Sequence, residues 1–329
     1  MFRTIRNCAA AFIACLALAS VAQAETELVV AEPVHSVGYL PLYVAIHNGY
    51  FTDEKLKVTV MTTEGGSAHT NAVLTKRAFA FIGGPEHNAF AKAKGAELRS
   101  VVNIVDRGNV YLVASSALPP PTGSLADYVK GKRLVVSFYG GTPNSILRYL
   151  LAKWSLDVKN DVTLIETGNA AVLAALATKQ GDIGVTTEPL LTQGIAKGIW
   201  GEPFYNVPKE LGPYAYSTIN VRKESVDTEA EAVKGFVRAM IKGLRFTYDN
   251  PGAAAEIAKK EFPTMPLEQL QATLKRSFDD EMWSRDGMVS PAAWDTAKAV
   301  VMEAGILTKD IGYDEIIDMR FVRTTISER

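Results

Sequence analysis

The sequence predicts an α/β protein of two similar lobes, each built on a mostly parallel sheet, and three observations support this. Short apolar runs alternate with loop glycines and alanine-rich helical stretches, which is the pattern of βα units. The pattern begins again near residue 133, after a proline-rich segment that looks like a surface connection into a second domain. The chain has 329 residues, 47% apolar and 22% charged, enough for two medium-sized domains.

The first half contains four expected strands, each followed by a loop or a helix. The apolar runs that predict these strands are 27–34, 57–63, 79–84 and 98–105. A helix is expected over 41–51, with Asn48-Gly49 as its carboxyl-terminal stop. Further helices are expected over 64–77 and 85–95.

The second half repeats this order and then becomes helical. Strands are expected at 133–138, 162–168, 182–187 and 215–221, and helices at 146–156, 169–180 and 188–198. Four more helices are expected after these, at 229–250, 252–262, 267–278 and 290–307, where they would return to cover the first lobe. Shifted by 103 positions, residues 72–84 lie over 175–187, so that Thr75-Lys76 meets Thr178-Lys179. Chance matches between alanine-rich helices are the alternative to two related lobes.

Residues 1–24 have the composition of a secretory signal peptide. Arg3 and Arg6 precede an apolar run over 9–19, and small residues over 22–24 form a cleavage site. The apolar run is too short for a membrane span, which needs about 20 residues, and no later run reaches that length. We therefore expect an exported, soluble, periplasmic protein.

Both cysteines, Cys8 and Cys15, lie inside this segment, so the mature chain would contain no thiol. Disulfides, thiol catalysis and cysteine metal sites are then excluded. As an alternative, Cys15 could be a lipid-modified first residue. Removal of Arg3 and Arg6 leaves 33 basic and 36 acidic residues, a formal charge of −3, and no basic run predicts a nucleic-acid partner.

Five loops follow expected strands and open helices, at 35–39, 65–69, 83–87, 139–145 and 186–189. In open α/β sheets such loops hold ligands, because free backbone N–H groups point from the helix starts. The loops match neither a Walker loop nor a dinucleotide fingerprint, so we expect no nucleotide and no cofactor. The expected ligand contacts are His35, Ser36, Tyr39, Gly66, Ser67, Gly84, Glu86, His87, Tyr139, Gly141, Thr142, Thr187 and Glu188.

Two chemical alternatives remain open in these loops. His35, His69, His87 and Glu86 are zinc-ligand types, but their spacing fits no metal motif, and hydrogen bonding is the better interpretation. Glu86 and Glu188 could perform acid–base chemistry across a cleft, or they could accept hydrogen bonds from N–H groups of a solute. No nucleophile elbow is present, and we expect no catalytic residue.

The order of these motifs resembles the periplasmic substrate-binding proteins of ABC importers, in the group for aliphatic sulfonates, taurine, nitrate and thiamine pyrimidine precursors. The resemblance runs from about residue 27 to 250. It rests on His35-x-x-Gly38-Tyr39-x-Pro41, Gly49-Tyr50-Phe51, Gly65-Gly66-Ser67, Gly84-Pro85, the segment 124–137, Gly141-Thr142 and Thr187-Glu188-Pro189. It implies two Rossmann-like lobes joined by hinge strands, in the type II arrangement, that close over a solute.

The chain departs from the family pattern in its first lobe. In the family, a turn of the form Gly-x-x-Asp is usual in both lobes. Here the second lobe keeps a glycine and an acidic residue at Gly181-Asp182, whereas the first lobe has Arg77-Ala78-Phe79 instead. No arginine falls in the expected cleft loops, and Glu86 would repel an anion. We therefore expect a neutral or nitrogen-bearing organic solute, such as a heterocycle stacked on Tyr39 or Tyr139, although a sulfonate-like solute stays open.

The resemblance implies a monomeric binding protein that captures a small solute by hinge closure and delivers it to an inner-membrane ABC permease, without catalysis. We expect the signal peptide at 1–24, the first part of lobe 1 at 25–112, lobe 2 at 113–214 and the return to lobe 1 with the C-terminal helices at 215–329. An enzyme on the same fold, acting on a pyrimidine-like molecule, is the alternative. A sensor module that presents its closed form to a membrane receptor is a third possibility.

Overall fold

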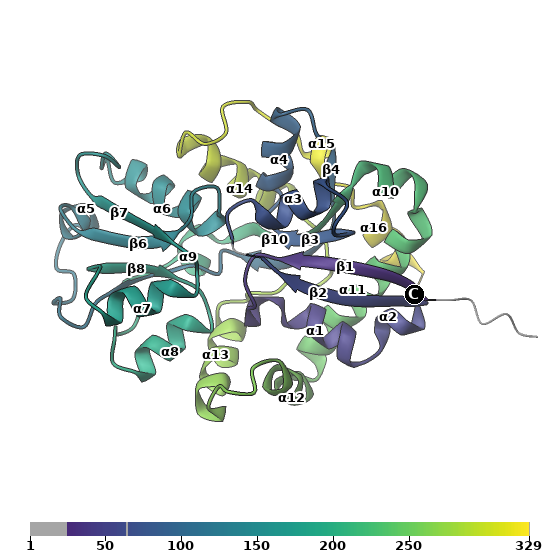
Figure 1. Cartoon of the computed structure of the whole chain (residues 1–329), viewed down its shortest axis with the longest axis horizontal. Helices are drawn as coiled ribbons and strands as arrows, with labels where there is room; N and C mark the ends of the chain where they lie inside the picture. Colours follow the sequence, from purple (N-terminus) through teal and green to yellow (C-terminus); the bar gives the residue numbers. More distant parts are fainter. Residues whose placement is uncertain (1–24, 64, 329) are drawn as a thin grey trace, which may run out of the picture.

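Two α/β lobes, each with a five-stranded sheet, lie side by side in the computed structural model (Figure 1). The structure describes residues 25–63 and 65–328, so the predicted signal peptide lies outside the described residues. The first lobe contains β1 (Thr26–Glu32), β2 (Leu56–Thr62), β3 (Ala80–Gly83), β4 (Leu98–Arg107) and β10 (Pro213–Arg222). The second contains β5 (Tyr111–Ala114), β6 (Arg133–Ser137), β7 (Thr163–Thr167), β8 (Ile183–Thr186) and β9 (Tyr205–Asn206).

The two sheets have the same strand order and the same directions. The orders are β2-β1-β3-β10-β4 and β7-β6-β8-β5-β9. In the first sheet β1 is parallel to β2 and β3, while β10 is antiparallel to both of its neighbours. In the second, β6 is parallel to β7 and β8, and β5 is antiparallel to both of its neighbours. One strand in each sheet therefore runs against the rest, and the prediction of mostly parallel sheets is confirmed.

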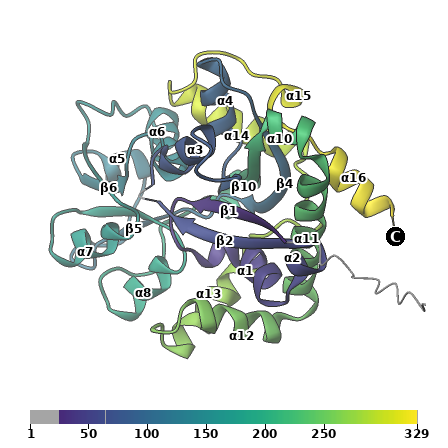
Figure 2. The same ribbon diagram turned by 45° about the vertical axis from the view of Figure 1, so that its right-hand side comes forward.

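Helices cover the sheets of both lobes (Figure 2). Those that follow strands of the first lobe are the 3₁₀ turn η1 (Val37–Tyr39), α1 (Leu40–His47), α2 (Tyr50–Asp53), α3 (Ala68–Leu74) and α4 (Glu86–Ala93). The middle of the chain contributes α5 (Leu125–Val129), α6 (Thr142–Lys153), α7 (Ala171–Ala177), α8 (Leu190–Ala196) and α9 (Val207–Leu211). The remainder are α10 (Lys223–Thr228), α11 (Ala230–Asp249), α12 (Pro251–Glu261), α13 (Leu267–Asp279), α14 (Pro291–Glu303), α15 (Tyr313–Ile316) and α16 (Arg320–Ser327).

The chain crosses between the lobes twice. It passes from β4 to β5 through residues 108–110 and returns from β9 through α9 to β10. In each sheet the antiparallel strand is the first one after a crossing, β5 in the second lobe and β10 in the first. The proline-rich segment 115–124 follows β5 and leads to α5. It is therefore a connection within the second lobe, and its interpretation as the entry into that lobe was wrong.

The internal repeat predicted from the 103-residue shift is confirmed by the structure. Added to the bounds of α3 and β3, the shift gives the bounds of α7 and β8. Lys76 and Lys179, paired by the shift, both adopt the left-handed conformation at φ 59°. The preceding Thr75 and Thr178 each donate a hydroxyl hydrogen bond to the carbonyl four residues earlier, at 2.7 and 2.9 Å. The matches are therefore structural and not an accident of alanine-rich composition.

Local sequence explains how the first strand leads into the first helix. The Ser36 hydroxyl caps the 3₁₀ turn by accepting a hydrogen bond from Gly38 N at 3.1 Å. Pro41 lies in the first turn of α1, where its missing N–H costs nothing. Gly49 takes φ +72° after α1 ends, which a residue with a Cβ adopts only at a cost. The predicted stop at Asn48-Gly49 is confirmed.

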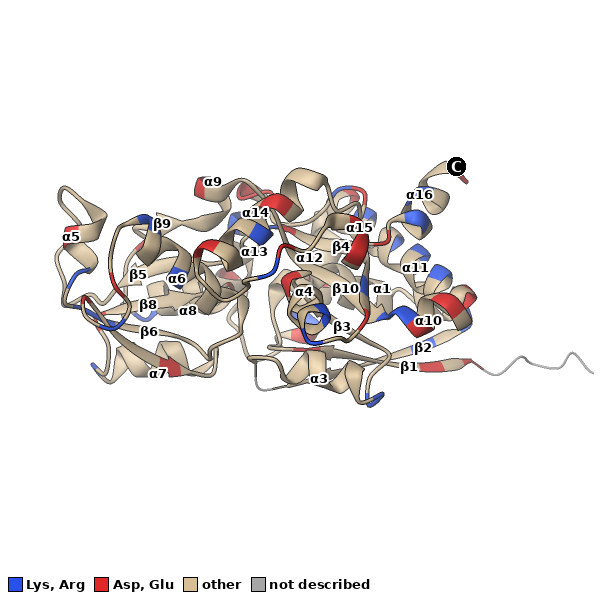
Figure 3. Ribbon diagram, turned by 90° about the horizontal axis from the view of Figure 1, so that it is seen from above, with Lys and Arg blue, Asp and Glu red and all other residues tan. Residues whose placement is uncertain are grey.

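The largest apolar cluster runs through both lobes, and it includes buried side chains of α11, α14 and β10. Helix α11 packs on α1 and α2 of the first lobe. Lys and Arg are mixed with Asp and Glu over the ribbons of both lobes (Figure 3). Among the described residues, no helix combines the length and apolar character needed to cross a membrane.

Candidate functional site

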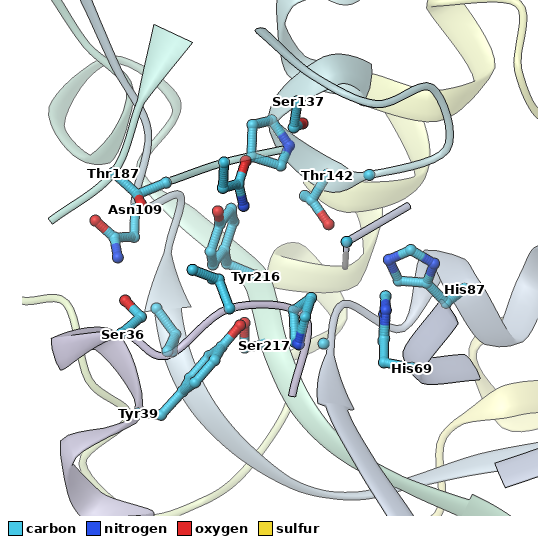
Figure 4. A pocket seen from close by; sticks show the side chains of 18 of the residues that line it. Ser36, Tyr39, His69, His87, Asn109, Ser137, Thr142, Thr187, Tyr216 and Ser217 are labelled. Atoms are coloured by element: carbon cyan, nitrogen blue, oxygen red, sulfur yellow. The ribbon is translucent and has the colours of Figure 1, made fainter. Parts of the chain in front are cut away.

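A cavity of about 40 Å³ lies between the lobes, at the carboxyl ends of the parallel strands. Figure 4 shows side chains from both lobes converging on it, with Ser36, Tyr39, His69 and His87 from the first and Ser137, Thr142 and Thr187 from the second. Tyr216 and Ser217 of β10 complete the wall. No lysine or arginine is among the described residues that line this space.

The loop after β1 contributes Ser36 and Tyr39, which are both buried. The Ser36 hydroxyl donates a hydrogen bond to the backbone carbonyl of Glu188 at 2.9 Å, so it joins the first lobe to the second. Burial and the charge of Glu32 raise the pKa of the Tyr39 hydroxyl, which stays protonated at physiological pH. This loop therefore offers neutral hydroxyl groups to the cavity and one bond across the cleft.

Two buried imidazoles form the next part of the wall. His69 of α3 and His87 of α4 lie edge to face, with ring centroids 4.5 Å apart. Both ring nitrogens of His69 lack a hydrogen-bond partner in the structure. Burial lowers the pKa of His87 to about 4 and holds the pKa of His69 well below its usual value, so both rings are neutral at pH 7. A neutral imidazole offers one donor and one acceptor, which suits a polar uncharged ligand.

Glu86 lies directly behind this wall, at the first position of α4. Its Oε1 accepts a hydrogen bond from the Thr142 hydroxyl at 2.6 Å, and Thr142 begins α6 in the second lobe. Its Oε2 is buried and has no partner. Burial raises the pKa of this carboxyl to about 7, against the smaller opposing effect of the Thr142 bond. A Cβ on Gly84 would lie 1.9 Å from Oε2, so only glycine leaves room for the carboxylate there.

Glu188 is the corresponding buried carboxylate of the second lobe, and its oxygens are partnered. The Thr192 hydroxyl donates to Oε1 at 2.7 Å, and Thr192 N donates to Oε2 at 3.1 Å. The Arg276 guanidinium of α13 binds Oε1 at 3.1 Å and reaches Glu202 with its other nitrogens. Burial raises the pKa of Glu188, while Thr192 and Arg276 act in the opposite direction. This carboxylate therefore binds α13, a helix from the C-terminal part of the chain, to the second lobe.

The second-lobe wall is built from the ends of β6 and β8 and the start of α6. Ser137 is the last residue of β6, and its hydroxyl is buried without a hydrogen-bond partner. Gly141 and Thr142 bring the amino-terminal end of α6 to the cavity, and Thr187 follows β8. Unpartnered buried polar groups cost free energy unless a ligand or water satisfies them. Ser137 and His69 are thus positioned to bond a solute.

The structure brings most of the predicted contacts together. Those that line the cavity are Ser36, Tyr39, Gly66, His87, Gly141, Thr142 and Thr187. Gly84, Glu86 and Glu188 are buried but are not among the lining residues, and Ser67 is not among them either. The positions of the strand ends and glycine pairs in the sequence therefore indicated which loops converge on the cavity.

His35 and Tyr139 lie away from the cavity. The His35 ring bonds Glu32 at 3.1 Å and packs on Phe262 of the C-terminal part and on Tyr43, with centroids 4.7 and 4.9 Å away. Tyr139 is 55% exposed and has the Arg148 guanidinium 5.0 Å from its ring centroid. Local partners hold both rings outside, and neither ring stacks on anything in the cavity.

Several lining residues were not expected from the sequence, among them Asn109, Ser137, Tyr216 and Ser217. Ser137 ends a strand, so its position carried a usable signal. Tyr216 and Ser217 lie inside β10, which pairs between β3 and β4 only after the chain returns from the second lobe. Asn109 lies in the crossing, where its amide oxygen accepts from Glu188 N at 3.2 Å. No local pattern marks Asn109, Tyr216 or Ser217.

The residues considered as zinc ligands, His35, His69, His87 and Glu86, do not form one ligand set in the structure. Within residues 25–63 and 65–328, no group of three or more His, Cys, Asp or Glu side chains is arranged to hold a metal ion. His69 and His87 share one wall, whereas His35 is turned toward Glu32 and Glu261. Hydrogen bonding is the chemistry that this arrangement offers.

Two α/β lobes of this topology, meeting at a cavity, define the fold of periplasmic binding proteins. The chain belongs to the NMT1/THI5-like family, whose model matches residues 36–254. It is 25% identical to the putative binding protein YtlA of Bacillus subtilis, an alignment that covers 98% of this chain and 97% of that protein.

Solved structures show the same fold. The alkanesulfonate-binding protein SsuA of Xanthomonas axonopodis, bound to MOPS, matches with a TM-score of 0.73 and 17% identity, over 91% of this chain and all of that one (100%). The desulfurization enzyme DSZB matches with a TM-score of 0.65 and 15% identity, over 92% and 99% of the two chains. YtlA and SsuA are named as binding proteins, whereas DSZB is an enzyme with the same fold.

Proposed function

We propose that this protein is a periplasmic solute-binding protein that captures a small organic molecule between its lobes and delivers it to an ABC permease. The observation that carries the proposal is the cavity itself, where both lobes place neutral hydrogen-bonding groups around one space. Binding pockets of this kind orient a ligand with a few placed polar groups. The family and its binding-protein relatives support the same role.

The cavity chemistry favours a neutral or nitrogen-bearing solute. No described lining residue is a lysine or arginine that could neutralise an anion, and the Glu86 carboxylate lies close behind the wall. His69, His87 and Ser137 instead offer uncharged donors and acceptors. Glu86 Oε2 could accept a hydrogen bond from a solute N–H after a small side-chain shift, which would satisfy its buried oxygen.

Hinge closure would couple binding to transport. We propose that the hinge lies at the two crossings, residues 108–110 and 207–212, where few residues connect the lobes. The bonds from Ser36 to Glu188 and from Thr142 to Glu86 span the cleft, so they exist only when the lobes meet. A solute that contacts both lobes would shift the population toward this closed form, which a permease could recognise.

A thermal-shift screen of the purified protein tests the proposal. The panel contains small amides, pyrimidines, amines, aromatic acids, sulfonates and nitrate, each with and without zinc. A solute at about 100 times its dissociation constant adds about 2.7 kcal/mol and raises the melting temperature by several degrees. We expect a nitrogen-bearing compound to stabilise the protein without being converted. If no compound in the panel stabilises the protein, the proposal is contradicted. If a stabilising compound is converted to a product, the alternative of an enzyme on the same fold is favoured.

The variant Glu86→Gln tests the solute chemistry. If Glu86 accepts a solute N–H, the affinity of a stabilising amine or pyrimidine falls by at least about tenfold, as for a bond to a charged group. Glu224→Gln is the matched control, because its carboxylate is exposed and pairs with Lys76 on the surface. Equal affinity in both variants would remove Glu86 from the site.

A further inference from the structure

A second space, here called the outer chamber, adjoins the cavity at the mouth of the cleft. Its volume is about 430 Å³, and its wall includes Pro33, Val34 and Thr62 of the first lobe and Phe138 and Ala170 of the second. Pro33, Val34 and Asn169 line both the outer chamber and the inner cavity, so the two spaces adjoin. The wall is mostly apolar. Its polar side chains are those of His35, Thr62, Thr63 and Asn169, and none of its described residues is Lys, Arg, Asp or Glu.

Phe138 gives the outer chamber a specific feature. It directly follows the last residue of β6 and remains 42% exposed, although most large apolar side chains of the chain are buried. Its Cβ lies 3.9 Å from where a Cβ would be on Gly66, so the side chain starts close to the loop of the opposite lobe. An exposed aromatic ring beside a ligand cavity offers a surface for stacking.

We propose that the outer chamber binds the flat apolar part of the same solute whose compact polar end binds in the inner cavity. The inner cavity has room for only a few atoms, since about 10–15 Å³ of such volume holds one water. The rest of a larger solute must therefore lie beyond it, and the outer chamber is the space that adjoins it. The inference rests on the proposed function and adds a substrate class, an amphipathic molecule with a small neutral nitrogen-bearing head and an aromatic or apolar tail.

Phenylacetamide and acetamide test this division, because they share an amide head and only the first has an aromatic tail. Affinities are measured by saturation-transfer NMR titration of the full protein and three variants. Phe138→Ala removes the stacking surface, and Tyr139→Ala is the matched control, since this neighbouring ring is exposed and lines neither space. Phe138→Leu keeps an apolar side chain without the ring, and circular dichroism checks that each variant folds.

We expect phenylacetamide to bind the wild type at least tenfold more tightly than acetamide. Phe138→Ala should reduce that advantage at least threefold, Phe138→Leu should reduce it less, and Tyr139→Ala should leave it unchanged. An equal affinity of the two probes for the wild type, an equal loss in the Phe138 and Tyr139 variants, or no binding of phenylacetamide would each overturn the proposal. If another compound of the thermal-shift panel still stabilises the protein, only the proposal for the outer chamber is contradicted. If no compound stabilises it, the proposed function is contradicted as well.

Discussion

The two lobes each place a glutamate beside a proline just after equivalent strands, but they use it differently. In the first lobe Pro85-Glu86 follows β3, and the carboxylate has one partner, the Thr142 hydroxyl of the other lobe. In the second lobe Glu188-Pro189 follows β8, and Glu188 is bound by Thr192 and by the Arg276 guanidinium. One carboxylate is left available beside the cavity, while the other secures the C-terminal part of the chain.

A second pair of equivalent positions differs in the same way. Asp182 in the second lobe pairs with Arg133 at the start of β6, with an oxygen–nitrogen distance of 2.8 Å and both side chains partly exposed. The matching position in the first lobe is Phe79, which packs near Phe236 of α11, with ring centroids 6.1 Å apart. The departure from the Gly-x-x-Asp pattern therefore has a structural reason, because α11 covers this end of the first lobe. The two lobes therefore share one framework of strands and helices, and equivalent loop positions differ where other elements of the chain pack on them.

The largest expected effect comes from removing the cation of the second-lobe carboxylate. Arg276→Met leaves Glu188 buried and without its ion-pair partner, which should lower the free energy of unfolding by about 3 kcal/mol. Urea unfolding measures the loss. Lys275→Met, on the same helix, is the control, since its pair with Asp279 is exposed and should contribute less than about 1 kcal/mol. Equal effects of the two substitutions would contradict a special role for Glu188.

The first-lobe carboxylate predicts a pH dependence of stability. The pKa of Glu86 is about 7 in the folded protein against 4.5 ordinarily, so the folded state binds the proton more tightly. The wild type should therefore lose stability as the pH rises from about 4.5 to 7, whereas Glu86→Gln lacks this loss. The difference between the two unfolding free energies should change by up to about 3 kcal/mol. His87 Nε2 lies 3.9 Å from Glu86 Oε1 and its pKa is about 4, so the two proteins are compared above about pH 5, where this ring is neutral in both. A difference that does not vary with pH in that range would refute the prediction.

A smaller effect is expected from the hydrogen bond across the cleft. Thr142→Val removes the donor to Glu86 and should weaken solute affinity about tenfold, because a bond to a carboxylate that closes the lobes is lost. Calorimetric titration with a stabilising compound from the panel measures this. Thr178→Val is the control, since its hydroxyl bonds only to carbonyls of its own helix, those of Ala174 and Ala175. Similar losses in the two variants would show that the cross-lobe bond does not control binding.

The smallest effect tests whether the repeated turns are equivalent. Lys76→Gly and Lys179→Gly replace residues at φ 59°, a left-handed conformation that glycine adopts without a Cβ penalty. Because Lys76 also pairs with Glu224 on the surface, both substitutions are made in a Glu224→Gln background. There each should stabilise the fold by about 0.5 kcal/mol, and the two values should agree. Lys130→Gly, at φ −57°, should destabilise it instead. Thermal unfolding measures all three, and opposite signs for Lys76 and Lys179 would show that the two turns are not equivalent.

Local sequence was informative wherever structure depends on near neighbours. The alternation of strands and helices, the stop at Gly49 and the match of Lys76 with Lys179 follow from periodicity and backbone preference. The same signals identified the convergent loops, because parallel strands end at one edge of a sheet. They could not show that His35 and Tyr139 face away, since those orientations depend on Phe262 and Arg148.

By itself the sequence determined two lobes, the strands other than β5 and β9, and the loops that could meet a ligand. Only the tertiary structure decided that β10 returns to bring Tyr216 and Ser217 into the cavity wall. It alone pairs Arg276 with Glu188, 88 residues apart, and leaves Glu86 with a free oxygen. The physical reason is that burial and long-range pairing set the charge and availability of a side chain, and these contacts form only when distant segments pack together.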